Sequence, residues 1–138
     1  MAKSKLQRRK ANSRSKYWRN KADKLWGAIL HHRQDSCAVC GRTGRLEAHH
    51  LISRVVGVMR HDLRNGIILC TQHHKFCTEL SAHEAPLQFA EWLQENRWEQ
   101  YLHCIERKKT VTREHIKPDY RQAYEDLKAI ADEEGAEV

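Results

Sequence analysis

The chain has 138 residues, including five cysteines and ten histidines, and a formal charge of +7. This length fits one domain with a modest core, and no apolar run approaches the roughly 18 residues that a membrane helix needs. The basic N-terminus lacks the apolar stretch of a signal peptide, so we expect a cytoplasmic protein without membrane contact. In such a chain, a Cys-x-x-Cys pair favours metal binding over disulfides.

The charge is distributed unevenly along the chain. Residues 1–24 hold ten Lys or Arg and one acid, whereas residues 114–138 hold eight Asp or Glu and three Lys or Arg. We expect residues 1–14 to be a basic flexible arm that orders on a polyanion, with a solubilising tail as the alternative. A central domain should cover residues 15–110, and residues 111–138 should form a C-terminal helix with an acidic tail.

Apolar spacing predicts the main elements. Residues 15–34 place apolar side chains on one face of an amphipathic helix: Trp18, Ala22, Leu25, Trp26, Ile29 and Leu30. Short strands are expected at residues 45–52 and 66–70, joined by an Arg-containing loop, and a helix should start near Cys70 or Thr71. A further helix is expected over residues 87–105 and a last one from about Asp119. The fold class is therefore α+β, with two short antiparallel strands and a helix flanked by further α-helices.

Four residues have the spacing of a structural zinc site. Cys37 and Cys40 lie two residues apart before a glycine, and Cys70 and His73 repeat that spacing. Thiolates and imidazole complete tetrahedral Zn²⁺ sites, so this clamp should tie the strand pair to the following helix. Cys77, four residues beyond His73, is a rival fourth ligand.

The combination of Cys-x-x-Cys, Glu47-Ala-His-His50, Asn65-Gly-Ile-Ile-Leu-Cys70 and His73-His74 resembles the HNH endonucleases, whose fold is the ββα-metal finger. The resemblance covers about residues 33–78. It implies that His50 is the general base, that His49 and His74 bind a catalytic divalent metal, and that Asn65 orients the base by holding the loop. The remainder resembles, more loosely, small HNH proteins of phages and prophages, and by analogy implies packaging or recombination proteins as partners.

Several features of the expected site follow from residue chemistry. Adjacent strand residues face opposite ways, so we expect irregular backbone where His49 and His50 meet at the site. Thr78 stands where many family members have a further ligand, which leaves two histidines and water to hold Mg²⁺ or Mn²⁺. Two alternatives stay open. His83 either returns to the site or lies in an exposed loop, and Glu47 either hydrogen-bonds an arginine or a group behind the metal ligands or is a surface carboxylate.

The expected activity is hydrolysis of DNA phosphodiester bonds, with Zn²⁺ as structural ion and no small-molecule cofactor. Arg54 and Arg60 are candidate phosphate contacts on the loop. The main alternative is a zinc-ribbon DNA-binding protein without catalysis, although it leaves the paired histidines and Asn65 unexplained. A toxin-like nuclease is disfavoured because no delivery region is present.

Overall fold

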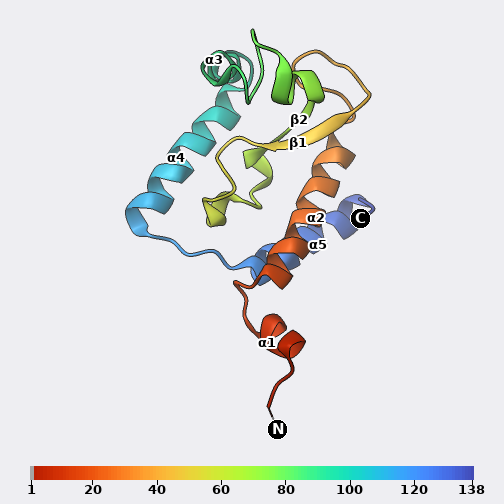
Figure 1. Ribbon diagram of the computed structural model, residues 1–138, viewed down its shortest axis with the longest axis vertical. Helices are drawn as coiled ribbons and strands as arrows, with labels where there is room; N and C mark the ends of the chain where they lie inside the picture. Colours follow the sequence, from red (N-terminus) through yellow and green to blue (C-terminus); the bar gives the residue numbers. More distant parts are fainter. Residues whose placement is uncertain (1) are drawn as a thin grey trace.

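The computed structural model describes residues 2–138 and confirms a mixed fold in which helices surround one antiparallel strand pair (Figure 1). The strands are β1 (Leu46–His50) and β2 (Gly66–Cys70). The helices are α1 (Lys5–Ala11), α2 (Lys16–Arg33), α3 (Pro86–Asn96), α4 (Trp98–Glu114) and α5 (Tyr120–Glu134), with short turns η1 (Gly57–Met59), η2 (Leu63–Asn65) and η3 (Gln72–Phe76). Among the described residues, no helix has the length and apolar content to cross a membrane.

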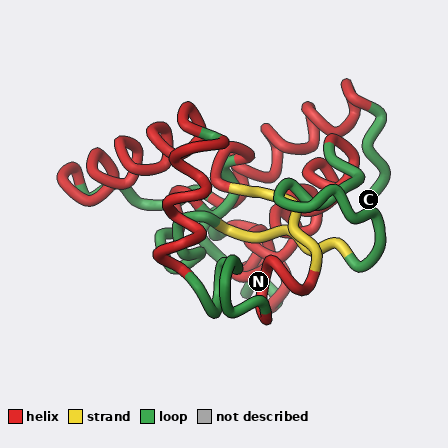
Figure 2. The backbone as a smooth tube through the Cα atoms, turned by 90° about the horizontal axis from the view of Figure 1, so that it is seen from above, coloured by secondary structure: helices red, strands yellow, loops and turns green. Residues whose placement is uncertain are grey.

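Strand β2 lies between two hydrophobic clusters. It pairs with β1 from Leu46 opposite Cys70 to His50 opposite Gly66, and all five of its residues are buried. Alternate side chains point to opposite faces of a strand. Ile68 accordingly packs with the buried residues of α2 and α5, while its neighbours Ile67 and Leu69 pack with residues of α3. The strand pair is therefore held from both sides, and Figure 2 shows helices around the two yellow strands.

Helices α2 and α5 pack side by side along one side of the molecule (Figure 1). The predicted apolar stripe of α2 is largely confirmed, because Ala22, Leu25, Trp26, Ile29 and Leu30 are buried. Trp18 is only half-buried, and its ring lies 5.5 Å from that of Tyr124 on α5. The expected last helix is also confirmed, with Leu127 and Ala131 buried and Asp119 capping its first turn.

Two expected elements differ from the structure. The single helix expected over residues 87–105 is two helices, because the backbone of Arg97 leaves the helical region between α3 and α4. Leu87 and Trp98 are 82% and 55% exposed, whereas Phe89 and Leu93 are buried.

The segment expected to be a flexible arm contains helix α1. The Ser4 hydroxyl accepts from the Gln7 amide while the Gln7 side chain accepts from the Ser4 amide, which forms a capping box that supports this short helix. The helix buries none of its residues. It is tied to α2 by the Trp18 indole, which donates to the Lys10 carbonyl, and by the Ser15 hydroxyl, which donates to the Arg9 carbonyl.

Candidate functional site

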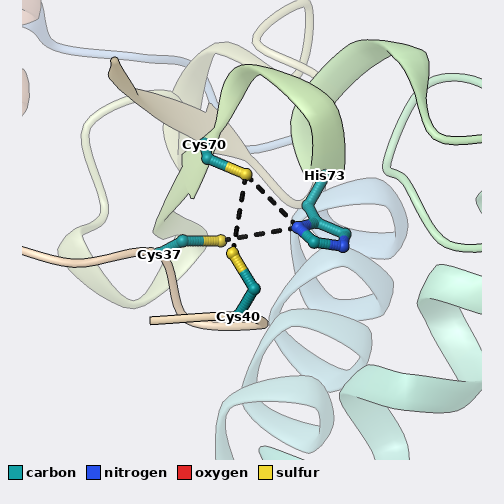
Figure 3. Close-up of side chains that lie close together, drawn as sticks. All are labelled: Cys37, Cys40, Cys70 and His73. Atoms are coloured by element: carbon teal, nitrogen blue, oxygen red, sulfur yellow. Dashed lines mark hydrogen bonds between the residues drawn. The ribbon is translucent and has the colours of Figure 1, made fainter. Parts of the chain in front are cut away.

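The two cysteine-containing segments meet at a cluster of three sulfurs and one ring nitrogen (Figure 3). The Sγ atoms of Cys40 and Cys70 are 3.8 Å apart, and His73 Nδ1 lies 3.2 Å from Cys70 Sγ and 3.9 Å from Cys37 Sγ. Gly41 has a φ of +75°, a conformation that glycine adopts without strain, and it turns the chain back after Cys40. All five cysteines are free thiols.

These distances fit one tetrahedral ion. With Zn–S bonds of about 2.3 Å and a Zn–N bond of about 2.0 Å, neighbouring sulfurs should be about 3.8 Å apart and sulfur and nitrogen about 3.5 Å. The four donor atoms all lie within 4.8 Å of one another. Cys77 is not among them, so His73 completes the cluster in place of the rival cysteine.

The helical segment after β2 is a π-helical turn, η3, instead of the expected α-helix. Its closing bond runs from the Cys77 amide to the Gln72 carbonyl, five residues back. The chain then reverses and lies beside this turn, because the amides of Ala82 and His83 donate to the carbonyls of His73 and His74. His73 of the cysteine cluster and His74 are thus adjacent on η3, and His83 is brought back beside His74.

Three histidines form a second donor cluster. One ring nitrogen each from His49, His74 and His83 lies within 4.8 Å of the others. The ring centroids are 4.8 Å apart for His49 and His74 and 4.6 Å for His74 and His83. His83 therefore returns to the side of His49 and His74, while the residue itself stays exposed. Because a turn separates His83 from His74 in the sequence, no regular residue spacing predicts that the two lie together.

Glu47 orients His74 within this cluster. The Nδ1–H group of His74 donates to the Glu47 carboxylate at 3.2 Å, and Lys75 donates to the other oxygen at 3.1 Å. Burial raises the pKa of Glu47, but these two hydrogen bonds outweigh it and hold the pKa below its usual value. A bond at Nδ1 leaves Nε2 of His74 free to bind a metal, which is how carboxylates commonly support histidine ligands.

His50 faces the other side of the strand. The backbone stays regular here, so the expected irregularity is wrong: His49 pairs with Ile67 and His50 with Gly66. The His50 ring stacks on Trp26 with centroids 3.9 Å apart and planes within 6°. Its Nε2 atom lies 2.9 Å from the Arg60 carbonyl oxygen. A carbonyl only accepts, so Nε2 carries the hydrogen and Nδ1 keeps its lone pair.

Both histidine environments open into one cleft of about 640 Å³, lined by His49, His50, Arg54, His74, Lys75 and His83 among others. Burial, reinforced by the neighbouring imidazoles, lowers the pKa of His49 to about 3. Burial also lowers the pKa of His50, although its bond to the Arg60 carbonyl acts in the opposite direction. Neutral imidazoles are therefore favoured at His49 and His50, and only the neutral form can bind a metal or accept a proton.

Asn65 holds the loop between the strands and does not line the cleft. It is fully buried, and its Oδ1 atom accepts from the Ile52 amide at 2.6 Å. Its Nδ2 group donates to the carbonyls of Ile52 and Met59, both at 3.0 Å. Asn65 thus fixes both the segment just after β1 and the η1 turn.

The two arginines expected to contact phosphate differ. Arg54 is exposed at the cleft, where an anion can reach it. Arg60 donates two hydrogen bonds of 2.8 Å to Asp23 of α2, and its side chain is only 13% exposed. The structure does not support Arg60 as a phosphate contact, because its guanidinium group is already paired inside the protein.

Comparison with known proteins identifies the central segment. Residues 37–76, which are 40 of the 138 residues, match a family model described as HNH endonuclease. The match starts at the first cysteine of the zinc cluster and ends with η3, so it includes both strands but not His83. Searches of curated proteins and of solved structures gave no match.

Proposed function

We propose that the chain is a metal-dependent endonuclease that hydrolyses DNA phosphodiester bonds, because residues 37–76 match the HNH endonuclease family model. The match to this family supports nuclease activity in general. The observation that carries the specific proposal is the shared cleft, which His50 lines together with the three imidazole donors His49, His74 and His83.

In this proposal His50 is the general base. Its Nε2–H group is engaged by the Arg60 carbonyl, so Nδ1 takes the proton from the attacking water. His49, His74 and His83 hold a divalent metal, which when bound stabilises charge on the phosphate and leaving oxygens. Asn65 keeps the loop in place, and Arg54 at the cleft contacts the DNA backbone.

The third histidine changes the expected metal. Two imidazoles with several waters suit Mg²⁺ or Mn²⁺, whereas three imidazole nitrogens favour first-row transition metals over Mg²⁺, which prefers oxygen. We therefore propose Mn²⁺, or a similar ion, as the working metal and Zn²⁺ for the cluster of Cys37, Cys40, Cys70 and His73.

DNA is the proposed substrate because the basic residues are concentrated near the N-terminus. Residues 1–24 carry ten Lys or Arg and one acid, and part of this segment is the exposed helix α1. Such charge gives sequence-independent attraction to phosphate that weakens as salt rises.

Plasmid cleavage with Mn²⁺, Mg²⁺ and EDTA tests the proposal. We expect nicking or linearisation with Mn²⁺ and a loss of about 10²–10⁴-fold for His50→Ala, with DNA binding retained. His31→Ala is the matched control, because His31 is exposed at the end of α2. Cleavage by His50→Ala at the wild-type rate would refute the assignment of the base. Binding without cleavage in every metal would instead identify a DNA-binding protein.

A further inference from the structure

We infer that Asp23 and Trp26, which lie three residues apart on α2, are positioning residues for the His50 imidazole. Trp26 fixes the plane of the ring, and Asp23 fixes the carbonyl group that binds its Nε2–H. The inference rests on the proposed function, because it assigns a role relative to the general base. Neither residue lies within the matched segment 37–76. Trp26 stacks on His50 itself, and Asp23 accepts from the side chain of Arg60, whose carbonyl binds His50.

Trp26 fixes the plane of the His50 ring. The two rings are parallel within 6° at a centroid distance of 3.9 Å, and Trp26 is only 4% exposed. The indole is itself held, because its N–H group donates to the Asp62 carbonyl at 3.0 Å. A ring stacked on a fixed surface restricts the two side-chain torsions of His50, so Nδ1 keeps one direction while Nε2 stays bonded to the Arg60 carbonyl.

Asp23 fixes the carbonyl that binds His50. Its carboxylate accepts two hydrogen bonds from Arg60 and a third, of 2.7 Å, from His61 Nε2. The side chains on both sides of the Arg60–His61 peptide are thus attached to one group on α2. The Arg60 carbonyl belongs to that same peptide, and it accepts from His50 at 2.9 Å. Asp23 therefore determines where the acceptor stands and, through it, which ring nitrogen of His50 is protonated.

The charge at Asp23 strengthens this link. Burial raises the pKa of the Asp23 carboxyl, but the hydrogen bonds from Arg60 and His61 outweigh it and hold the pKa well below its usual range. The carboxylate is therefore ionised at neutral pH. Paired hydrogen bonds from a guanidinium to a carboxylate also restrict the angle between the two groups, which a single contact does not.

A kinetic comparison of variants tests the inference. Cleavage of a duplex oligonucleotide is measured with saturating Mn²⁺ for Asp23→Asn, Trp26→Leu and Trp26→Phe. Because a displacement of about 1 Å at a reacting group costs up to about 10²-fold in rate, we expect kcat to fall about 10–100-fold for Asp23→Asn and Trp26→Leu, with KM changed less than about threefold. Trp26→Phe should lose less, since it keeps a stacking ring.

Two controls separate positioning from general stability. Glu134→Gln removes another arginine–carboxylate pair between α2 and α5, that of Arg33, and should leave kcat unchanged. The nitrogen-15 spectrum of histidine side chains should assign the Nε2–H tautomer to His50 in the wild type and a mixture of tautomers in Asp23→Asn. Zinc content and melting temperature show whether each variant is folded, and Asp23→Asn carries the test if Trp26→Leu does not fold.

The outcomes are distinct. If His50→Ala cleaves normally, the proposed function fails. If His50→Ala is inactive while folded Asp23→Asn and Trp26→Leu keep kcat within about twofold of the wild type, only the positioning role is refuted. An equal loss of kcat in Glu134→Gln would also overturn it, because the effect would then belong to helix packing.

Discussion

Replacing Gly66 with alanine should destabilise the protein by crowding the residues behind His50. A Cβ atom at Gly66 would lie 2.4 Å from Leu30 Cδ1 and 2.6 Å from Trp26 Cζ2. Ordinary carbon contacts are about 3.5–4.0 Å, so the added methyl overlaps both neighbours by about 1 Å. The Leu30 methyl group can rotate away. The Trp26 ring has less freedom, because it is bound to the Asp62 carbonyl and stacked on His50.

Overpacking of this kind typically costs about 1–3 kcal/mol. For a domain of this size each kcal/mol corresponds to a few degrees, so we expect the melting temperature to fall by about 4–10 °C. Displacement of the Trp26 ring should also reduce cleavage. Thermal and urea unfolding, followed by tryptophan fluorescence, measure the change in the free energy of unfolding.

Gly27 supplies the matched control for this experiment. It lies inside α2, and an added Cβ would meet no atom within 4 Å. Alanine is favoured over glycine in a helix by about 0.5–1 kcal/mol, so Gly27→Ala should stabilise the protein. The reasoning is refuted if Gly66→Ala melts at or above the wild-type temperature while Gly27→Ala behaves as expected.

Three further predictions concern other parts of the site. Asn65→Ala should lower the free energy of unfolding by about 3–5 kcal/mol, because it removes a buried side chain and three hydrogen bonds and leaves the amide and the carbonyl of Ile52 unpaired; Asn96→Ala, which removes one bond at an exposed helix end, should change it by less than about 0.5 kcal/mol in the same urea titration. The metal-free protein should lose stability as pH falls from about 6.5 towards 3, because burial lowers the pKa of His49 to about 3 and the unfolded chain binds the proton more readily. His49→Gln should flatten that acid titration, and an unchanged slope would contradict the buried neutral state. Strong chelation should lower the melting temperature of the wild type by more than about 10 °C and release one zinc per chain, whereas Cys40→Ser should melt low with or without chelator; a chelator-insensitive wild type without bound zinc would disprove the clamp.

Local sequence patterns predicted much of the fold and of the zinc cluster. The apolar period of α2 predicts a helix, and the β-branched run Ile67–Ile68 predicts a strand. Both patterns are visible because residues close together in the sequence determine these elements. The repeated two-residue spacing brings Cys37 with Cys40 and Cys70 with His73, because such pairs reach one ion from a single turn. The alternation of a regular strand also explains why His49 and His50 have different neighbours.

Features that depend on distant contacts were not predictable in the same way. His83 reaches the cleft only because the chain reverses after η3, and no period or spacing encodes that reversal. Arginine is a residue type that commonly contacts phosphate, but the partner of Arg60 is Asp23, which lies 37 residues away on another element. Helix α1 depends on a capping box of two polar side chains in a segment whose basic composition suggested no order.

The proposed zinc site of Cys37, Cys40, Cys70 and His73 also has a consequence for the unfolded chain. Linking Cys40 to Cys70 through one ion closes a loop of 29 residues that contains β1, His49, His50 and Asn65. A cross-link over a loop of this length removes chain entropy worth roughly 3–4 kcal/mol from the unfolded state, by the relation used for disulfides. A chain that binds zinc early therefore searches for the pairing of β1 with β2 inside a short closed loop, and its cleft histidines are confined to one region before the flanking helices dock.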